Sequence, residues 1–272
     1  MVVPRALHHA NALLPNLAEG KPKSKIHQTG SHLKIYNFFL TNNLRSRHKM
    51  ETPTKPEIFV FSLGDAQQQS LLREVHGRLM DALAAKSNLR QATNAQDALG
   101  LLTQNGQPNG VFVTDPDIAV SKNHAVSEQL KDYVHNGGTL VLGGLFSAQI
   151  RPNDLGKYMR EKWDLPWEAG SYHRTTLFLN DQVVNRPSSG LPSSYSQKAV
   201  FLKNVDPDTA WYVATDRSVP ESLIPMPGRG IDLLETSVAF VRIGNGSLGY
   251  VGDVNAEEGT DAVVLAMFGL SS

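Results

Sequence analysis

Cysteine is absent from the 272-residue sequence. The chain therefore forms no disulfide, holds no metal ion through a thiolate and has no cysteine nucleophile. It also lacks an apolar run long enough to cross a membrane, which takes about 20 residues. These absences fit a reducing compartment, and we expect a cytoplasmic protein with no membrane partner.

Acidic residues are scarce at the N-terminus. Residues 1–49 hold eight of the 26 Lys and Arg residues but one of the 26 acids, Glu19. No hydrophobic period is sustained there, which predicts a disordered basic extension over residues 1–55. A mitochondrial presequence is one alternative, because such segments are basic and poor in acids. Translated sequence upstream of a true start at Met50 is another.

The remaining residues carry the opposite charge balance. Taking the N-terminal segment from the totals leaves 18 basic and 25 acidic side chains in residues 50–272, a net charge of −7. A mildly acidic domain offers no electrostatic footprint for nucleic acid, so we expect no such partner. The N-terminal histidines show no regular ligand spacing, and we predict no metal site.

Strand and helix patterns alternate from residue 57 to residue 142. Apolar runs predict strands over 58–61, 89–93, 111–114 and 139–142. Apolar residues at three- and four-residue spacing predict helices over 66–86, 95–102 and a third ending at His135. We expect the polar His76 at the surface of the first helix. Such alternation predicts a parallel sheet with helices on both faces.

The C-terminal part is expected to add an antiparallel hairpin. Residues 237–243 and 248–252 flank Gly244-Asn245-Gly246, and Asn-Gly favours a tight hairpin turn. Further patterns predict a helix over 154–163 and strands over 172–179, 199–202 and 211–215. We therefore predict an α/β fold over residues 56–272: a single doubly wound, mainly parallel, flavodoxin-like sheet with a C-terminal antiparallel hairpin.

Two segments carry a resemblance to a known superfamily. They are GGTLVLGG at residues 137–144 and SVAFVRIGNGSLGYVGDVNAE at residues 237–257, followed by a helix. In this order they resemble the class I glutamine amidotransferase-like superfamily, including its non-glutaminase ThuA-like relatives. The resemblance implies a cysteine nucleophile on the turn after the central strand, in a G-x-C-x-G context. It also implies a His-x-Glu pair after the last strand.

The turn after the central strand departs from that pattern. Alignment on Gly143 puts Leu145 at the nucleophile position, and alignment on Gly144 puts Phe146 there. Neither side chain attacks a carbonyl. The segment after the last strand supplies Asp253, Asn255 and Glu257 but no histidine. We therefore expect no glutamine hydrolysis through a thioester.

These departures predict a non-catalytic or small-molecule-binding domain. Its crevice would lie past the carboxyl ends of the parallel strands, where ligands collect in open α/β sheets. The residues expected to line the crevice are Gly144, Leu145, Phe146, Asp253 and Asn255.

A hydrolase with a rearranged site is the alternative. It would use Ser147 as nucleophile, His173 as base and Asp253 or Glu257 as the acid. A serine in a turn is more often a helix cap, and acids before a helix are explained by capping without catalysis. No G-x-G-x-x-G fingerprint or P-loop lysine is present, so we predict no cofactor. The sequence leaves the oligomeric state open.

Overall fold

A nine-stranded mixed sheet forms the core of the residues that a computed structural model describes, namely 55–103, 107–184, 190–221 and 230–270. All of them belong to one unit, residues 53–272. Apart from Lys55, the extension expected over residues 1–55 lies outside the described residues. The strand order is β2-β1-β3-β4-β9-β8-β7-β5-β6.

The first five strands in this order run parallel, as the alternating pattern predicts. They are β2 (Asn88–Ala92), β1 (Glu57–Phe61), β3 (Gly110–Val113), β4 (Thr139–Leu142) and β9 (Gly246–Val251). Every residue of β3 and β9 is buried. Burial on both faces is why β3 reads as a continuous apolar run rather than as an alternation.

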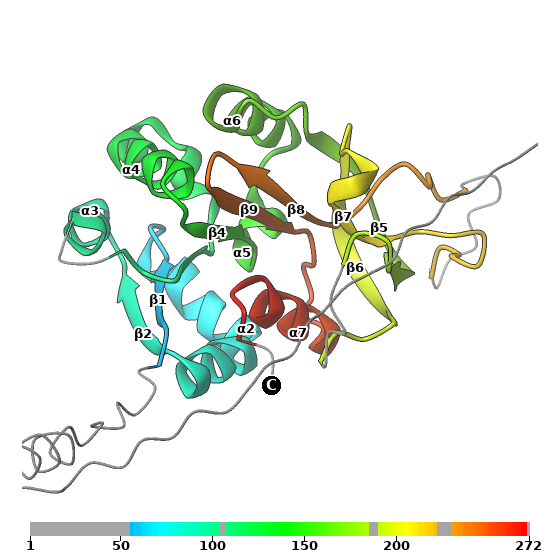
Figure 1. Ribbon diagram of the computed structural model, residues 1–272, viewed down its shortest axis with the longest axis horizontal. Coiled ribbons are helices and arrows are strands. Elements are labelled where there is room, and N and C mark those ends of the chain that lie inside the picture. Colours follow the sequence, from blue (N-terminus) through cyan, green and yellow to red (C-terminus); the bar gives the residue numbers. More distant parts are fainter. Residues whose placement is uncertain (1–54, 104–106, 185–189, 222–229, 271–272) are drawn as a thin grey trace, which may run out of the picture. The chain divides into compact units, whose positions relative to one another are not determined.

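Helices cover both faces of the parallel strands (Figure 1). One face carries α2 (Ala66–Lys86) and α7 (Glu258–Met267). The other carries α3 (Ala95–Thr103), α4 (His124–His135) and α6 (Pro152–Trp163). Two short 3-10 turns, η1 (Pro116–Ala119) and η2 (Ser121–Asn123), lead into α4, and α5 (Leu145–Gln149) follows β4. The doubly wound α/β fold is thus confirmed.

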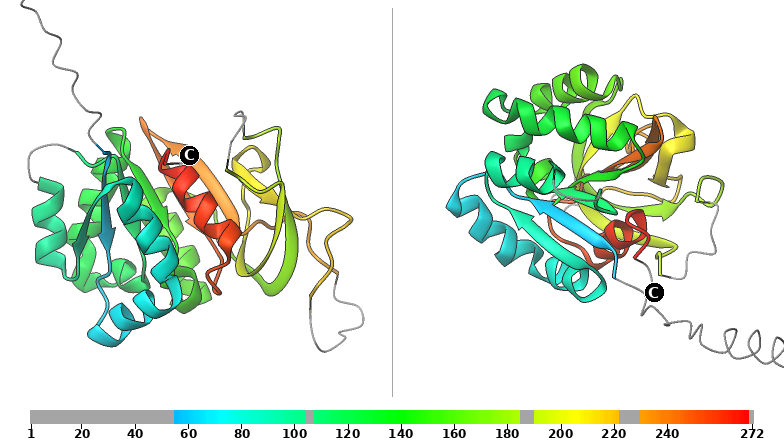
Figure 2. Two further views of the ribbon diagram at one scale, coloured as in Figure 1. Left: turned by 90° about the horizontal axis from the view of Figure 1, so that it is seen from below. Right: turned by 60° about the vertical axis from the view of Figure 1, so that its left-hand side comes forward.

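The antiparallel part of the sheet is larger than the expected hairpin. β8 (Val238–Ile243) pairs with β9 as predicted. Beyond it lie β7 (Ala210–Val213), β5 (Glu168–Leu179) and β6 (Ser194–Lys203). In the left view of Figure 2 these yellow-green strands stand beside the orange hairpin, away from α3 and α4. The sequence predicts strands in these places, but local patterns do not show that they extend the same sheet.

β6 folds back onto the end of β9. The backbone N–H of Val200 donates to the Gly252 oxygen at 2.9 Å, and that of Leu202 donates to the Thr236 oxygen at 2.7 Å. These bonds close the antiparallel strands into a lobe. They also place β6 next to the loop that follows β9.

The expectation that His76 lies at the surface is wrong. Its exposed fraction is 2%, and its backbone leaves the helical conformation at φ −109° and ψ 18°, so that α2 bends there. His76 lies four residues after Leu72 and three before Leu79, both buried. That spacing puts it on the inner face of the helix. The prediction followed the polarity of the His76 side chain, whereas its spacing from Leu72 and Leu79 indicates the buried face.

None of the helices in the described ranges is both long and apolar enough to cross a membrane.

Candidate functional site

Four loops meet at the carboxyl edge of the parallel strands. They follow β1 (62–65), β3 (114–117), β4 (143–147) and β9 (252–257). Open α/β sheets bind ligands at this edge, particularly where the strand order reverses. Here the order reverses between β1 and β3, because the chain goes from β1 outward to β2 and then returns to β3.

The turn after β4 is a sharp elbow that needs glycine. Gly144 has φ +61° and ψ −127°, a conformation that a residue with a Cβ avoids. The Leu145 and Phe146 side chains are 4% and 0% exposed. The Phe146 ring packs against Tyr158 of α6 with their centroids 6.3 Å apart. At the position where the superfamily pattern has its nucleophile, this chain therefore has core residues.

Ser147 and Asp253, two residues named for the hydrolase alternative, are neighbours. The Ser147 hydroxyl donates to the backbone oxygen of Asp253 at 3.3 Å, and both residues are 1% exposed. A serine nucleophile needs its hydroxyl hydrogen-bonded to a base. Here the hydroxyl joins two loops, because its acceptor is a peptide carbonyl.

The carboxylate of Asp253 organises the loop before α7. It accepts hydrogen bonds from the backbone N–H groups of Asn255 at 2.8 Å and Glu257 at 2.7 Å. Between them Ala256 adopts φ +56°, a left-handed conformation that is uncommon for alanine. Asn255 is exposed, whereas the Glu257 carboxylate forms an ion pair with Arg174. Capping and ion pairing account for both acids.

His173 does not join the other proposed hydrolase residues. Side chains alternate across a strand, so Arg174 reaches Glu257 while the neighbouring His173 turns to the other face. The His173 ring stacks on Phe201, with centroids 4.4 Å apart and planes 5° apart. Burial lowers the pKa of His173, and the charge of Glu235 opposes that shift in part. Among the described residues, no hydrogen bond links His173 to Ser147, Asp253 or Glu257.

The histidine whose pKa responds to Asp253 is His76 of α2. Burial lowers the pKa of His76, and the Asp253 carboxylate raises it in part. The Nε2 atom of His76 is buried without a hydrogen-bond partner in the described part of the chain. Two residues further along α2, Arg78 forms an ion pair with Asp261 of α7 and donates to the Ala256 oxygen of this loop. These contacts join α2 to the β9 loop and to α7.

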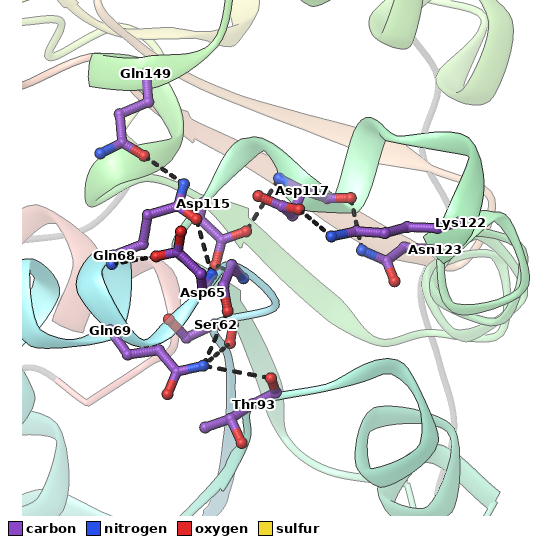
Figure 3. Close-up of polar contacts among 11 residues, drawn as sticks. Ser62, Asp65, Gln68, Gln69, Thr93, Asp115, Asp117, Lys122, Asn123 and Gln149 are labelled. Atoms are coloured by element: carbon purple, nitrogen blue, oxygen red, sulfur yellow. Dashed lines mark hydrogen bonds and ion pairs between the residues drawn. The ribbon is translucent and has the colours of Figure 1, made fainter.

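Asp115 lies at the point where the strand order reverses (Figure 3). It is 1% exposed, and its carboxylate accepts from the backbone N–H groups of Gly64 at 3.2 Å and Asp117 at 3.0 Å. Burial raises the pKa of Asp115 to about 6, although these hydrogen bonds oppose the shift. The sequence predicts a strand that ends at residue 114, directly before Asp115. Its place directly after a buried strand was the available signal.

A side-chain link spans the loops after β1 and β4. Asp65 and Gln68 form a reciprocal capping box at the start of α2. The free end of Gln68 then donates to the Gln149 side chain at 2.9 Å, as Figure 3 shows. This link fixes the first turn of α2 against the end of α5.

A cleft of about 700 Å³ opens between η1, η2 and α4 on one side and α6 on the other. We call it the α4–α6 cleft. Across it, Ser127 and Tyr158 place their hydroxyls 3.2 Å apart, and Lys162 pairs with Glu128. Burial raises the pKa of Tyr158 to about 12, so its hydroxyl stays protonated at neutral pH.

The lining of the α4–α6 cleft is polar and nearly balanced in charge. It includes four acids, three Lys or Arg residues and one histidine: Asp117, Glu128, Asp154, Glu161, Arg151, Lys157, Lys162 and His124. Sequence reasoning missed this cleft because its two walls come from helices paired only in the folded chain. No group of three or more His, Asp or Glu side chains arranged for a metal ion occurs within the described ranges.

Comparisons with known proteins identify a shared fold but no family. No family model matches the sequence, and no curated protein matches it significantly. A ThuA-like protein from Parabacteroides merdae ATCC 43184 is 14% identical, with 80% of this chain and 90% of that chain covered and a TM-score of 0.50. At this identity the likeness shows a shared fold, in agreement with the fold-level resemblance to ThuA-like proteins that the sequence suggests.

Two further solved structures are similar at lower scores. A ThuA-like protein from Bacteroides uniformis ATCC 8492 is 10% identical, covering 79% of this chain and 90% of that chain with a TM-score of 0.48. A GMP synthase subunit from Thermoplasma acidophilum is 11% identical, covering 79% and 94% with a TM-score of 0.43.

Proposed function

We propose that this domain binds a small polar molecule and does not catalyse glutamine hydrolysis. The observation that carries the proposal is the contrast at the carboxyl edge of the sheet. The elbow side chains Leu145 and Phe146 are sealed in the core, while the α4–α6 cleft opens beside them. A nucleophile must be accessible to its substrate and activated by a base, whereas a ligand binds in a concave pocket lined by suitable side chains.

The elbow supports the cleft from behind. Phe146 packs against the Tyr158 ring, and Tyr158 lines the cleft. Phe146 therefore holds a wall of the site in place rather than touching the ligand, and Leu145 is likewise buried. Gly144 supplies the bend that makes this packing possible. Asn255 is exposed in the loop after β9, and it remains a candidate ligand contact in the crevice expected past the carboxyl ends of the parallel strands.

The lining indicates the class of ligand. Acidic and basic side chains nearly cancel there, so a polyanion such as nucleic acid gains little from the field of the cleft. Exposed polar side chains of both signs, such as Lys157 and Glu161, favour a compact polar molecule without large net charge. A cytoplasmic location is part of the same proposal.

A ligand screen by NMR on the full-length chain tests this function. Small polar compounds are expected to shift the backbone amides of residues 116–128 and 150–162. Lys157→Ala should weaken binding several-fold, because the exposed Lys157 lines the cleft with no ion-pair partner among the described residues. Lys131→Ala, on α4 but outside the lining, is the matched control and should leave affinity unchanged. Binding confined to residues 143–147 and 253–257 would contradict the proposal.

A further inference from the structure

A second hollow lies at the other end of the same sheet edge. It has a volume of about 530 Å³ and sits where β1 and β2 end, beneath α2. We call it the edge pocket and define it by Ser62, Leu72, Arg73, Glu74, Met80 and Thr93. The edge pocket shares no lining residue with the α4–α6 cleft. Ligand binding at the edge pocket can therefore be tested separately from the proposed function.

The floor of the edge pocket combines one hydroxyl with apolar surface. Ser62 is 6% exposed, and its hydroxyl oxygen is buried without a hydrogen-bond partner among the described residues. Buried hydroxyls in native proteins are nearly always paired, because an unpaired one loses its hydration without compensation. Leu72 and Met80 beside it are buried apolar side chains. A ligand with an acceptor and an apolar body would satisfy both.

The loops that frame the floor are fixed. The Gln69 amide donates to the backbone oxygen of Gly64 at 3.0 Å and to that of Thr93 at 3.4 Å, joining the loops after β1 and β2 (Figure 3). A bound molecule would therefore meet a preformed site rather than order one, which lowers the cost of binding.

The rim supplies a free guanidinium. Arg73 is exposed, lines the pocket and makes no hydrogen bond or ion pair within the described ranges. Its planar fork suits a carboxylate, which accepts two parallel hydrogen bonds. Glu74 is the next residue on the helix and also lines the pocket, so the charged lining sums to zero. That carboxylate disfavours a doubly charged group such as phosphate.

We propose that the edge pocket binds a small monocarboxylate with an apolar body. The carboxylate pairs with Arg73, the body packs on Leu72 and Met80, and the Ser62 hydroxyl donates to the ligand. Glu74 limits the site to a single negative charge.

Three probes titrated into the full-length chain and followed by NMR test this site. Benzoate should give saturable shifts at the amides of residues 69–74 and 91–93. Benzamide has the same shape without the charge and should bind about tenfold more weakly, the loss expected for a charge-assisted hydrogen bond. Inorganic phosphate should give no saturable shift. Equal binding of benzoate and benzamide, saturation by phosphate alone, or no saturation by any probe would overturn the proposal.

A pair of adjacent substitutions with opposite effects sharpens the test. Arg73→Gln should weaken benzoate binding about tenfold, whereas Glu74→Gln should strengthen it, because one removes the attracting charge and the other the repelling charge. Arg160→Gln, on α6 and outside the lining of both pockets, is the control and should leave benzoate binding unchanged. All three residues are exposed, so these variants should fold. Benzoate binding that is indifferent to Arg73→Gln would overturn the assignment.

Ser62→Ala tests the floor separately. It breaks no hydrogen bond within the described residues, so the melting temperature of the free protein should not fall. Its affinity for benzoate should nevertheless drop several-fold. A lower melting temperature with unchanged benzoate affinity would show that Ser62 has a structural partner instead, and would overturn its role as a ligand contact.

Discussion

At the scale of single residues, Asp115 links stability to pH. Burial raises its pKa in the folded protein to about 6 from an ordinary value of 3.8. The folded state therefore holds the proton more tightly than the unfolded state. The stabilisation is fully present below the unfolded pKa and is lost as pH rises through the folded pKa.

The effect of Asp115→Asn on the free energy of unfolding should therefore depend on pH. The free energy of unfolding of the variant relative to the wild type should rise by roughly 2–3 kcal/mol between about pH 4 and pH 7. Urea unfolding of both proteins at several pH values measures this, and any constant cost of the substitution cancels. A difference that does not change over that range would mean that the Asp115 carboxyl is not perturbed.

Ala256 is a residue whose backbone conflicts with its side chain. Its φ of +56° costs an L-amino acid about 1 kcal/mol, and glycine avoids that cost while losing some chain entropy. We expect Ala256→Gly to stabilise the domain slightly, by about 0.5 kcal/mol. Ala98→Gly, inside α3 and buried, is the control and should destabilise by about 1 kcal/mol. Chemical denaturation of both variants measures whether the two substitutions change the free energy of unfolding in opposite directions.

Single residues also show which features of the site could be predicted from the sequence. The elbow at Gly144 and the absence of a cysteine after it were visible from residue types alone, because the resemblance gives each a fixed place in the sequence. The ion pair between Arg174 and Glu257 was not visible, since its partners are 83 positions apart and no local pattern joins them. His76 was misplaced although its spacing carried the correct answer.

At the scale of elements, glycine decides how closely β9 and α4 approach. A Cβ on Gly246 would lie 2.1 Å from the backbone oxygen of Val134 and 2.2 Å from that of Gly138. Backbone atoms of a helix end and a strand start cannot move independently, so Gly246→Ala should destabilise by about 1–3 kcal/mol. Gly77 in α2 has open space around it.

The matched substitution Gly77→Ala should therefore stabilise the domain. Alanine is favoured over glycine in a helix by about 0.8–1 kcal/mol. The free energy of unfolding of the two variants is expected to change in opposite directions. A stabilising Gly246→Ala would show that the β9–α4 contact is looser than described, and a destabilising Gly77→Ala would tie glycine to the bend at His76.

Elements differ in how far their sequence specifies them. β1, β3, β4 and the β8–β9 hairpin were predicted because apolar runs and the Asn-Gly turn are local signals. The joining of β5, β6 and β7 to the same sheet was not predicted. Strand partners are set by register and packing across long sequence separations, and half-buried strands such as β5 carry weak patterns.

At the scale of the whole molecule, the N-terminal segment is the largest part outside the described residues. We predict that removing residues 1–49 leaves folding unchanged, because the first strand begins at Glu57. The melting temperatures of the full chain and of a chain starting at Met50 should agree. A drop of several degrees in the shorter chain would show that residues 1–49 stabilise the domain.

We propose that the elbow after β4 is not catalytic. The measurement that tests it most directly is turnover of glutamine and of a broad panel of ester and amide substrates, with the wild type and Ser147→Ala compared. We predict no turnover above background by either protein, because the Ser147 hydroxyl is bonded to the Asp253 carbonyl and is 1% exposed. Turnover by the wild type that disappears in a folded Ser147→Ala variant would contradict the account and establish the rearranged hydrolase instead.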